Sequence, residues 1–331
     1  MKTNQLILAA AIIAIAGCAK SNVIDNVDTE SNEIGFNAVT AKATKANTDI
    51  VTSTAYPEDN SFGIWAFNSA AGDWSEFEAT TPSNFMTGLK IEKTTGRDNT
   101  RPEAWRNAAN YYYWPYTGAI AFIACHPFEV VPTVKYGGAT IGDYTISNSN
   151  KTVDLMFASA TGNRTTNAST PVSLAFKHAL SQIYFTIKTD ADYTVDDVTF
   201  EVNSITIKNI DLSGDVTYNK TTINWEDNDT QTQNWTYCDD DVNATHAGVA
   251  YGSAIVMIPQ AANAQTILTI AYTMTQNTIE SSGSIDVPAS QAWAVNGKYQ
   301  YILNFKLSEI LFSPGVTDWA ELTVIEKEIT L

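Results

Sequence analysis

Apolar side chains alternate with polar ones through much of the second half of this chain, and this period of two constrains the fold more than any other feature. The longest run has apolar members at Tyr299, Tyr301, Leu303, Phe305 and Leu307. Successive side chains of a β-strand point to opposite faces, so the run predicts a half-buried strand. Shorter runs follow the same rule at residues 172–176, 183–187, 198–202 and 268–274. No segment has a sustained helical period, so we predict an all-β protein.

Other features of the pattern predict how these strands are arranged. Residues 62–67 and 120–125 are apolar on both faces, which is typical of central strands. The alternation changes phase near Asn203-Ser204, which predicts a bulge or a turn. A stretch rich in Gly, Asn and Thr within residues 160–169 favours a domain boundary. At 331 residues the chain is long enough for two domains, and we predict consecutive β-sandwiches at residues 34–160 and 161–331.

The first eighteen residues have the pattern of an export signal. Lys2 precedes an apolar run at residues 6–15, which is too short to cross roughly 30 Å of hydrocarbon as a helix. The tetrad that follows ends in Cys18 and resembles the lipobox of bacterial lipoproteins, whose cysteine receives lipid. This resemblance implies a signal peptide at residues 1–17 and a lipidated, flexible tether at residues 18–33. Ordinary secretion is the alternative, because Ala14-Ile15-Ala16 also fits a small-x-small cleavage site.

Two further cysteines, Cys125 and Cys238, lie far apart in the sequence. Cys125 stands inside an apolar run and is predicted to be a buried strand residue. An exported protein meets an oxidising compartment, so a disulfide between the two is left open.

Composition and missing motifs argue against several classes of function. The net charge of −17 would repel phosphate backbones, so nucleic acid is not an expected partner. His126, His178 and His246 lack zinc-ligand spacing, and we expect His178 to be a strand-end histidine bonded to a backbone carbonyl. The acidic runs at residues 227–229 and 239–241 lack the glycine and terminal glutamate of a calcium loop. Because no catalytic or nucleotide-binding motif is visible, we predict no enzyme, no cofactor and no metal.

Aromatic residues gather between positions 105 and 116. The members are Trp105, Tyr111, Tyr112, Tyr113, Trp114 and Tyr116. Flat rings stack on sugars and dock onto proteins, so this cluster is the best candidate for a binding surface. The other interpretation, which we favour, is a core strand packed against the opposite sheet.

Six short motifs occur together in the order and spacing of a known family. They are Tyr113-Trp114-Pro115, Asp154-Leu155-Met156-Phe157-Ala158, and the segments at residues 172–180, 256–260, 293–299 and 310–319. Behind a lipobox, they resemble the fimbrillin-like lipoproteins of Bacteroidales bacteria, the building blocks of type V pili. The resemblance covers essentially the whole mature chain. It implies two transthyretin-like β-sandwich domains in a surface-exposed outer-membrane lipoprotein that serves as a structural subunit of a fimbria and contributes to adhesion.

The resemblance also implies how subunits join. In polymerising members an outer-membrane protease cuts after a basic residue and removes the first strand, and the carboxy-terminal segment of a neighbouring subunit fills the groove. Here the removed strand would be residues 34–40, with Ile34, Phe36 and Ala38 filling the groove. The donor would be residues 319–331, with the apolar side chains Trp319, Leu322, Val324, Ile325, Ile329 and Leu331. An added strand restores a hydrogen-bonded ladder and buries alternate side chains, as in β-augmentation.

One departure from the family pattern concerns the cleavage site. Polymerising members are usually cut after arginine, whereas Lys42 and Lys45 follow the first strand here. A lysine-directed protease would be needed, or the subunit stays uncut as an anchor or capping accessory. The implied partners are other copies of this chain or related pilin subunits, together with the outer membrane through the lipid. The alternative function is a non-polymerising surface lipoprotein that binds glycans or host proteins, with a ligand that the sequence does not identify.

Overall fold

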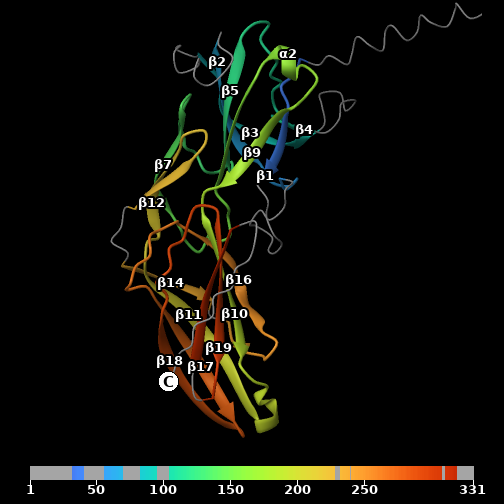
Figure 1. The fold of residues 1–331 in the computed structure, drawn as a ribbon. Helices are drawn as coiled ribbons and strands as arrows, with labels where there is room; N and C mark the ends of the chain where they lie inside the picture. The colour runs from blue at the N-terminus through green and yellow to red at the C-terminus, as the bar shows by residue number, and fades with distance from the viewer. Residues whose placement is uncertain are drawn as a thin grey trace, which may run out of the picture.

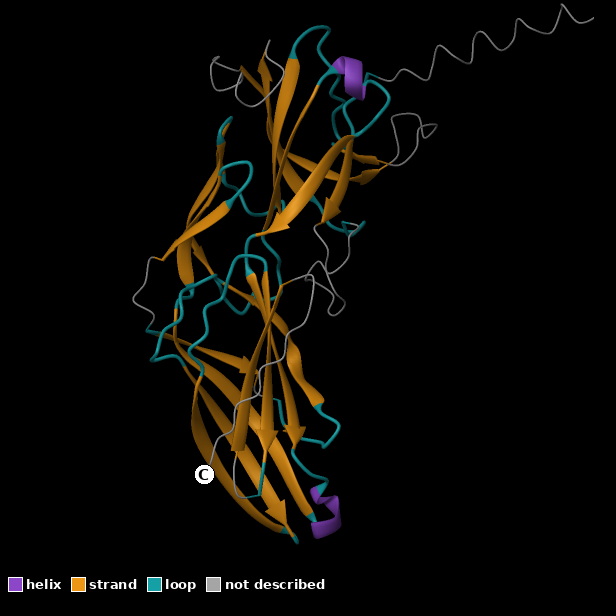
Figure 2. Cartoon of the chain, in the orientation of Figure 1, coloured by secondary structure: helices purple, strands orange, loops and turns teal. Residues whose placement is uncertain are grey.

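The computed structural model describes residues 32–40, 56–69, 83–94, 104–227, 232–238, 240–307 and 310–318 of the chain. In these ranges the fold is an elongated arrangement of β-structure (Figure 1). Helix is confined to α2 (Arg164–Asn167) and the short 3-10 helix η2 (Tyr193–Asp196), which lie at opposite ends of the molecule (Figure 2). The prediction of an all-β protein is confirmed. Neither of these short helices could cross a membrane, and the described residues contain no helix that could.

Seven strands close into a barrel at the amino-terminal end. Their hydrogen-bonded order is β1 (Phe36–Thr40), β4 (Ala104–Arg106), β3 (Ser83–Thr94), β2 (Phe62–Ser69), β5 (Ala119–His126), β8 (Met156–Gly162) and β9 (Val172–His178). Neighbours are antiparallel except at the closure, where β1 runs parallel to β9. The first strand of the described chain therefore completes the barrel.

Strands β2 and β5 are apolar on both faces because both faces are covered. Phe62 and Phe122 point into the barrel and belong to its core. Trp65 and Ile123, on the opposite faces of the same strands, belong to a second core that extends toward the carboxy-terminal half. The prediction that these segments are central, doubly buried strands is confirmed.

The predicted domain boundary within residues 160–169 is wrong. These residues form the end of β8 and the connection through α2, and the next strand, β9, pairs with β8 and with β1 in the same barrel. Asn163 caps α2 by accepting a hydrogen bond from the backbone N–H of Thr166. A tight connection inside a domain uses the same Gly, Asn and Thr residues as a linker, so composition alone misplaced the boundary by about one strand.

The carboxy-terminal half is a sandwich of two sheets. One has the order β16 (Val249–Met257), β10 (Ser181–Thr189), β19 (Gly297–Phe305) and β20 (Ile310–Asp318). The other has the order β14 (Gln233–Cys238), β11 (Val198–Ile210), β17 (Ile267–Gln276) and β18 (Ile279–Pro288), with β15 (Val242–Asn243) beside β11. Rings from the two sheets meet between them: Phe200 lies 5.6 Å from Phe305, and Phe185 lies 4.6 Å from Tyr237.

The period-two pattern of the sequence corresponds to this burial. Tyr299, Tyr301, Leu303 and Phe305 of β19 are all buried, whereas Leu307 lies beyond the end of the strand and is 46% exposed. The phase change near residues 203–204 is a register shift between Val202 and Ser204 within one continuous strand, β11. The bulge prediction is therefore confirmed.

A third sheet joins the two halves of the chain. Its order is β13 (Ile223–Asp227), β12 (Ser213–Tyr218), β7 (Gly138–Thr145) and β6 (Thr133–Lys135), so each half of the sequence supplies two strands. Ring stacking also connects this sheet to the barrel, because Phe157 of β8 lies 5.3 Å from Tyr218 of β12. One continuous apolar core consequently runs from the outer face of the barrel into the sandwich.

The two cysteines do not form a disulfide. Cys125 is fully buried in β5, and Cys238 ends β14. Burial raises the pKa of the Cys125 thiol well above its ordinary value, so the group is held in its neutral form.

Two histidines are buried near the base of the barrel. His178 Nδ1 lies 2.5 Å from Asp154 Oδ2, and both side chains are almost fully buried, so the predicted carbonyl partner of His178 is wrong. His126 Nδ1 lies 2.5 Å from the hydroxyl of Tyr56. Desolvation lowers the pKa of His126, because a low-dielectric interior disfavours the imidazolium form.

The depressed pKa of His126 predicts a loss of stability in acid. The unfolded chain binds a proton at about pH 6.5, whereas the folded chain binds it only at lower pH, so stability falls as the pH drops below about 6.5. Melting temperature measured from pH 8 to pH 5 should therefore fall less steeply in His126→Gln than in the wild type. His246→Gln is the control for the substitution itself, because His246 is an exposed histidine. Equal slopes in all three proteins would contradict this assignment.

Candidate functional site at the first strand

Among the described residues, strand β1 pairs along its whole length with one neighbour and at a single position with the other. Residues 36–40 pair in parallel with residues 172–176 of β9, whereas the register with β4 contains the single pair Phe36 and Trp105. Along this open side lies a cavity of about 350 Å³, lined by parts of β1, β3 and β4 and by Tyr56, Glu58 and Thr170. Strand β1 thus closes the barrel between β9 and β4 (Figure 1).

The inward side chains of the first strand fill the barrel core. Ile34, Phe36, Ala38 and Thr40 alternate with more exposed neighbours and are each at most 5% exposed. The ring of Phe36 meets Phe122 edge to face at a centroid distance of 5.2 Å. Burying an isoleucine or a phenylalanine contributes about 1.5–3 kcal/mol each, so loss of the strand would open an apolar trough. The three predicted groove-filling residues thus lie together on the inward face.

The chain just before β1 is also part of the fold. The backbone N–H of Ile34 donates to the carbonyl of Tyr112, and that of Trp114 donates to the carbonyl of Asn32, both at 2.7 Å. Glu33 forms an isolated bridge with Tyr113, and its carboxylate oxygens lie 3.4 Å from Arg106 Nη1. The prediction of a solvated tether reaching Glu33 is wrong at this end, because the carboxylate is buried beside a guanidinium.

The aromatic cluster between residues 105 and 116 divides into core and surface groups. Trp105 packs edge to face on Tyr56 at 4.8 Å, and Trp114 does the same on Phe122 at 5.9 Å. Tyr111 and Tyr112 are half-buried, and Tyr112 packs near Phe85. Tyr113 and Tyr116 are 47% and 86% exposed, and the ring of Tyr116 lies 5.2 Å from the Arg164 guanidinium. Core packing accounts for the tryptophans, and these two tyrosines are the exposed members.

Several predicted sites lie outside the described residues. They are the lipidation residue Cys18, the processing residues Lys42 and Lys45, and the donor residues Trp319, Leu322, Val324, Ile325, Ile329 and Leu331. Strand β20 ends at Asp318, at the outer edge of its sheet next to β19. The donor segment therefore follows an edge strand directly in sequence.

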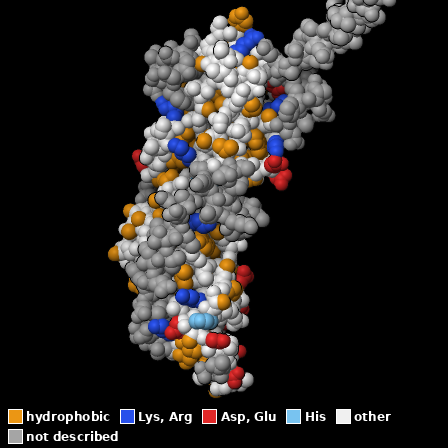
Figure 3. All heavy atoms as spheres, turned by 45° about the vertical axis from the view of Figure 1, so that its right-hand side comes forward, with side chains coloured by type: hydrophobic (Ala, Val, Ile, Leu, Met, Phe, Trp, Pro, Cys, Tyr) orange, Lys and Arg blue, Asp and Glu red, His pale blue; other side chains and the backbone are white. Residues whose placement is uncertain are grey.

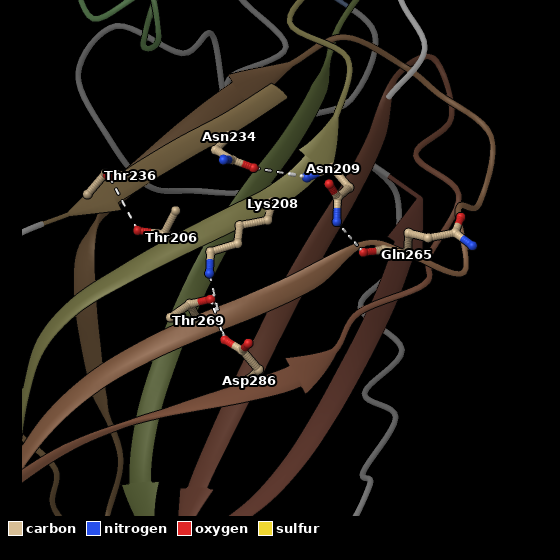
Figure 4. A network of polar contacts seen from close by, with 8 residues as sticks. All are labelled: Thr206, Lys208, Asn209, Asn234, Thr236, Gln265, Thr269 and Asp286. Carbon is tan, nitrogen blue, oxygen red and sulfur yellow. Dashed lines mark hydrogen bonds and ion pairs between the residues drawn. The ribbon is translucent and has the colours of Figure 1, made fainter. Parts of the chain in front are cut away.

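The described residues contain no group of three or more His, Cys, Asp and Glu side chains placed to hold a metal ion. Of the two acidic runs, Asn228, Asp229 and Asp239 are outside the described residues. The polar side chains that do gather form a network on the outer face of the sandwich, across β11, β14, β17 and β18 (Figure 4).

This network consists of short, local contacts between neighbouring strands. Thr206 and Thr236 meet at 3.3 Å, and Thr269 donates to Asp286 at 2.5 Å (Figure 4). Lys208 Nζ lies 3.9 Å from the same Asp286 carboxylate. Cross-strand pairs of this kind stabilise a sheet by roughly 0.2–1 kcal/mol each. This part of the outer face therefore carries mainly neutral polar groups with one Lys–Asp pair. On the face drawn in Figure 3, charged side chains of both signs are scattered among hydrophobic and other ones.

Truncating the central side chain of β1 tests how much the barrel depends on it. Phe36→Ala should lower the free energy of unfolding by about 3–5 kcal/mol, because it leaves a cavity against Phe122. Asn37→Ala is the matched control on the exposed face of the same strand, and it should change stability by less than about 0.5 kcal/mol. Urea unfolding of the full chain, followed by tryptophan fluorescence, measures both. Similar small losses in the two variants would show that β1 adds little to the core.

The amino-acid sequence matches a model of the fimbrillin-like family over residues 44–319. It is 26% identical over 249 residues to the fimbrium subunit Fim1C of Phocaeicola vulgatus. The matched region is 70% of this chain and 62% of that relative, so the chain spans less than two thirds of the relative's length. The fold is similar to that of a fimbrial protein from Bacteroides vulgatus, with a TM-score of 0.60 and 16% identity over 90% of this chain and 99% of that one. It is also similar to a candidate cell adhesion protein from Bacteroides uniformis, with a TM-score of 0.52 and 19% identity over 87% and 98% of the two chains. Since the family match covers well over half of the residues, this chain belongs to the fimbrillin-like family.

Proposed function

We propose that this chain is a structural subunit of a cell-surface fimbria, and that it assembles by exchange of its first strand. Membership of the fimbrillin-like family and the likeness to a fimbrium subunit support the role. The observation that supports strand exchange is the asymmetry of β1, which has five pairs with β9 and one with β4. A strand bonded on one side can leave with a smaller loss of hydrogen bonds than one in the middle of a ladder.

The first step is a cut after Lys42 or Lys45. Both follow Thr40, the last residue of β1, so either cut frees the strand at its carboxyl end. Once the strand leaves, the edge of β9 and the apolar trough are exposed to water, which is unfavourable for both the backbone groups and the core. The trimmed subunit would begin near Ala46 and require a replacement strand.

The second step is insertion of residues 319–331 of another copy. This segment follows β20, and its apolar side chains suit a groove that now holds Ile34, Phe36 and Ala38. The incoming strand would restore the ladder along β9 and refill the core. Lipid on Cys18 would hold an uncut subunit at the outer membrane, and trimming would release it into the filament.

Cleavage after lysine should control assembly. Treating the purified full chain with a lysine-specific protease should yield detergent-resistant ladders on gels and a new amino terminus at or just before Ala46 by mass spectrometry. The double variant Lys42→Gln with Lys45→Gln should remain uncut at this position and monomeric. Lys135→Gln, which removes an exposed lysine from β6, is the control and should behave as the wild type. A trimmed protein that remains monomeric would contradict the proposal.

The carboxy-terminal segment should be required for the same ladders. A chain that lacks residues 319–331 should be cut normally yet remain monomeric, because no donor strand is supplied. Adding the deleted variant to the wild type should shorten the ladders, since its groove accepts a donor but it offers none. If the deleted chain polymerises as well as the wild type, another segment is the donor. If both remain monomeric and bind a glycan or a host protein instead, the non-polymerising function is correct.

A further inference from the structure

A buried ion pair joins the removable segment to the part of the barrel that stays. Both carboxylate oxygens of Glu33 lie 3.4 Å from Arg106 Nη1. The Glu33 side chain is 4% exposed and the Arg106 side chain is 9% exposed. Arg106 is the last residue of β4, which is next to β1 in the barrel. Glu33 comes three residues before Phe36, the first residue of β1 to pair with β9.

Removal of the first strand would separate these two charges. Cleavage after residue 42 or 45 releases Glu33 with β1, but Arg106 remains in the wall of the groove. A guanidinium remains protonated at every physiological pH, so it cannot adapt by losing its charge. Removing one partner of a buried ion pair is strongly unfavourable, which gives the groove a charge preference in addition to its apolar one.

We infer that Arg106 selects the strand that enters the groove by the charge that it carries. The inference rests on the strand exchange proposed above. The occupant is the carboxy-terminal segment of a second copy of this chain, and it must place a carboxylate immediately before its first inward apolar side chain. A neutral residue there loses the ion pair, and a lysine or arginine there brings two like charges together in the barrel wall.

The composition of the carboxy-terminal segment fits this requirement. Residues 319–331 contain three Glu (321, 326 and 328) and one Lys (327), a net side-chain charge of −3 + 1 = −2. The order Glu33-Ile34-Gly35-Phe36 is acidic, apolar, small, apolar. The same acidic and apolar order occurs twice in the segment, as Glu321-Leu322-Thr323-Val324 and as Glu328-Ile329-Thr330-Leu331. Either stretch can present a carboxylate to Arg106 with an apolar residue directly after it.

Peptide exchange tests the selection directly. The full chain is nicked with a lysine-specific protease, and a fluorescent peptide with the sequence of residues 32–40 is added to displace the resident strand. Three peptides are compared: the native one and those with Glu33→Gln and Glu33→Lys. The Gln peptide should bind at least about tenfold more weakly than the native one, because the buried pair is lost, and the Lys peptide more weakly still.

The same peptides on a variant protein separate charge from shape. In nicked Arg106→Glu the order should reverse, so that the Lys peptide binds best. In Arg106→Gln the preference for the native peptide should disappear, and the Gln peptide should bind as well as the native one or better, because the Glu33 carboxylate would then be buried without the guanidinium. Equal preference for the three peptides in the wild type, or an unchanged order in Arg106→Glu, would overturn the inference. If ladders form but the peptides bind without a charge preference, the inference about Arg106 is wrong and the proposed assembly is supported. If peptide binding depends on charge but no ladders form, the selection by Arg106 is supported and the proposed assembly is wrong.

A charge exchange in the uncut chain tests the pair without any cleavage. Glu33→Arg and Arg106→Glu should each lower the melting temperature, and the double variant should recover at least half of the larger loss. Glu280→Arg is the control for surface charge, because Glu280 is exposed on β18 in the sandwich and has no part in the barrel ladders. No recovery in the double variant would show that the two groups are not coupled, and the selection by Arg106 would then be wrong.

Discussion

The rest of the amino-terminal barrel depends on the parallel pairing of β1 with β9. Five residue pairs of this ladder close a sheet whose other strands are all antiparallel, and the inward side chains of β1 complete the core beneath it. Parallel neighbours cannot be joined by a tight hairpin, so the closing strand has to come from a distant part of the sequence. In this chain it comes from the start of the fold. A position at the end of the chain and at the closure of the sheet makes β1 essential to the barrel, yet only one cut in the chain is needed to separate it.

The two halves of the molecule share this plan. In the sandwich, β10 runs parallel to β19, just as β1 runs parallel to β9 in the barrel, and in both cases the first strand of the unit pairs with a late one. The two units are not independent, however. The sheet formed by β6, β7, β12 and β13 takes strands from both, and the buried Asp154–His178 pair lies where β9 leaves the barrel and the chain passes to β10. A well-packed junction therefore lies between the first strand and the sandwich.

The distribution of charge is consistent with the proposed exchange of the first strand. Charged residues make up only 17% of the chain. Glu33 and Arg106 are among the few charged side chains that are buried in the described residues. A buried pair adds little net stability compared with an apolar pair of the same size, but it discriminates strongly against the wrong partner. Such a pair would suit the strand exchange proposed above, in which the first strand is replaced by a matching one.

The local pattern of apolar residues was sufficient to predict the strand content, the doubly buried β2 and β5, and the bulge in β11. Alternating runs predicted the half-buried strands and continuous runs predicted β2 and β5, because each of these features depends on a few neighbouring side chains. The partner of each strand depends on closure over long distances, which a local pattern does not encode. For that reason the sequence misplaced β9 in the second domain, gave His178 a carbonyl partner in place of Asp154, and treated Glu33 as part of a solvated tether. Which residues alternate was determined by the sequence alone. Which strand closes the barrel, and which charge it buries there, was decided only by the tertiary structure, because both require groups about seventy residues or more apart to meet.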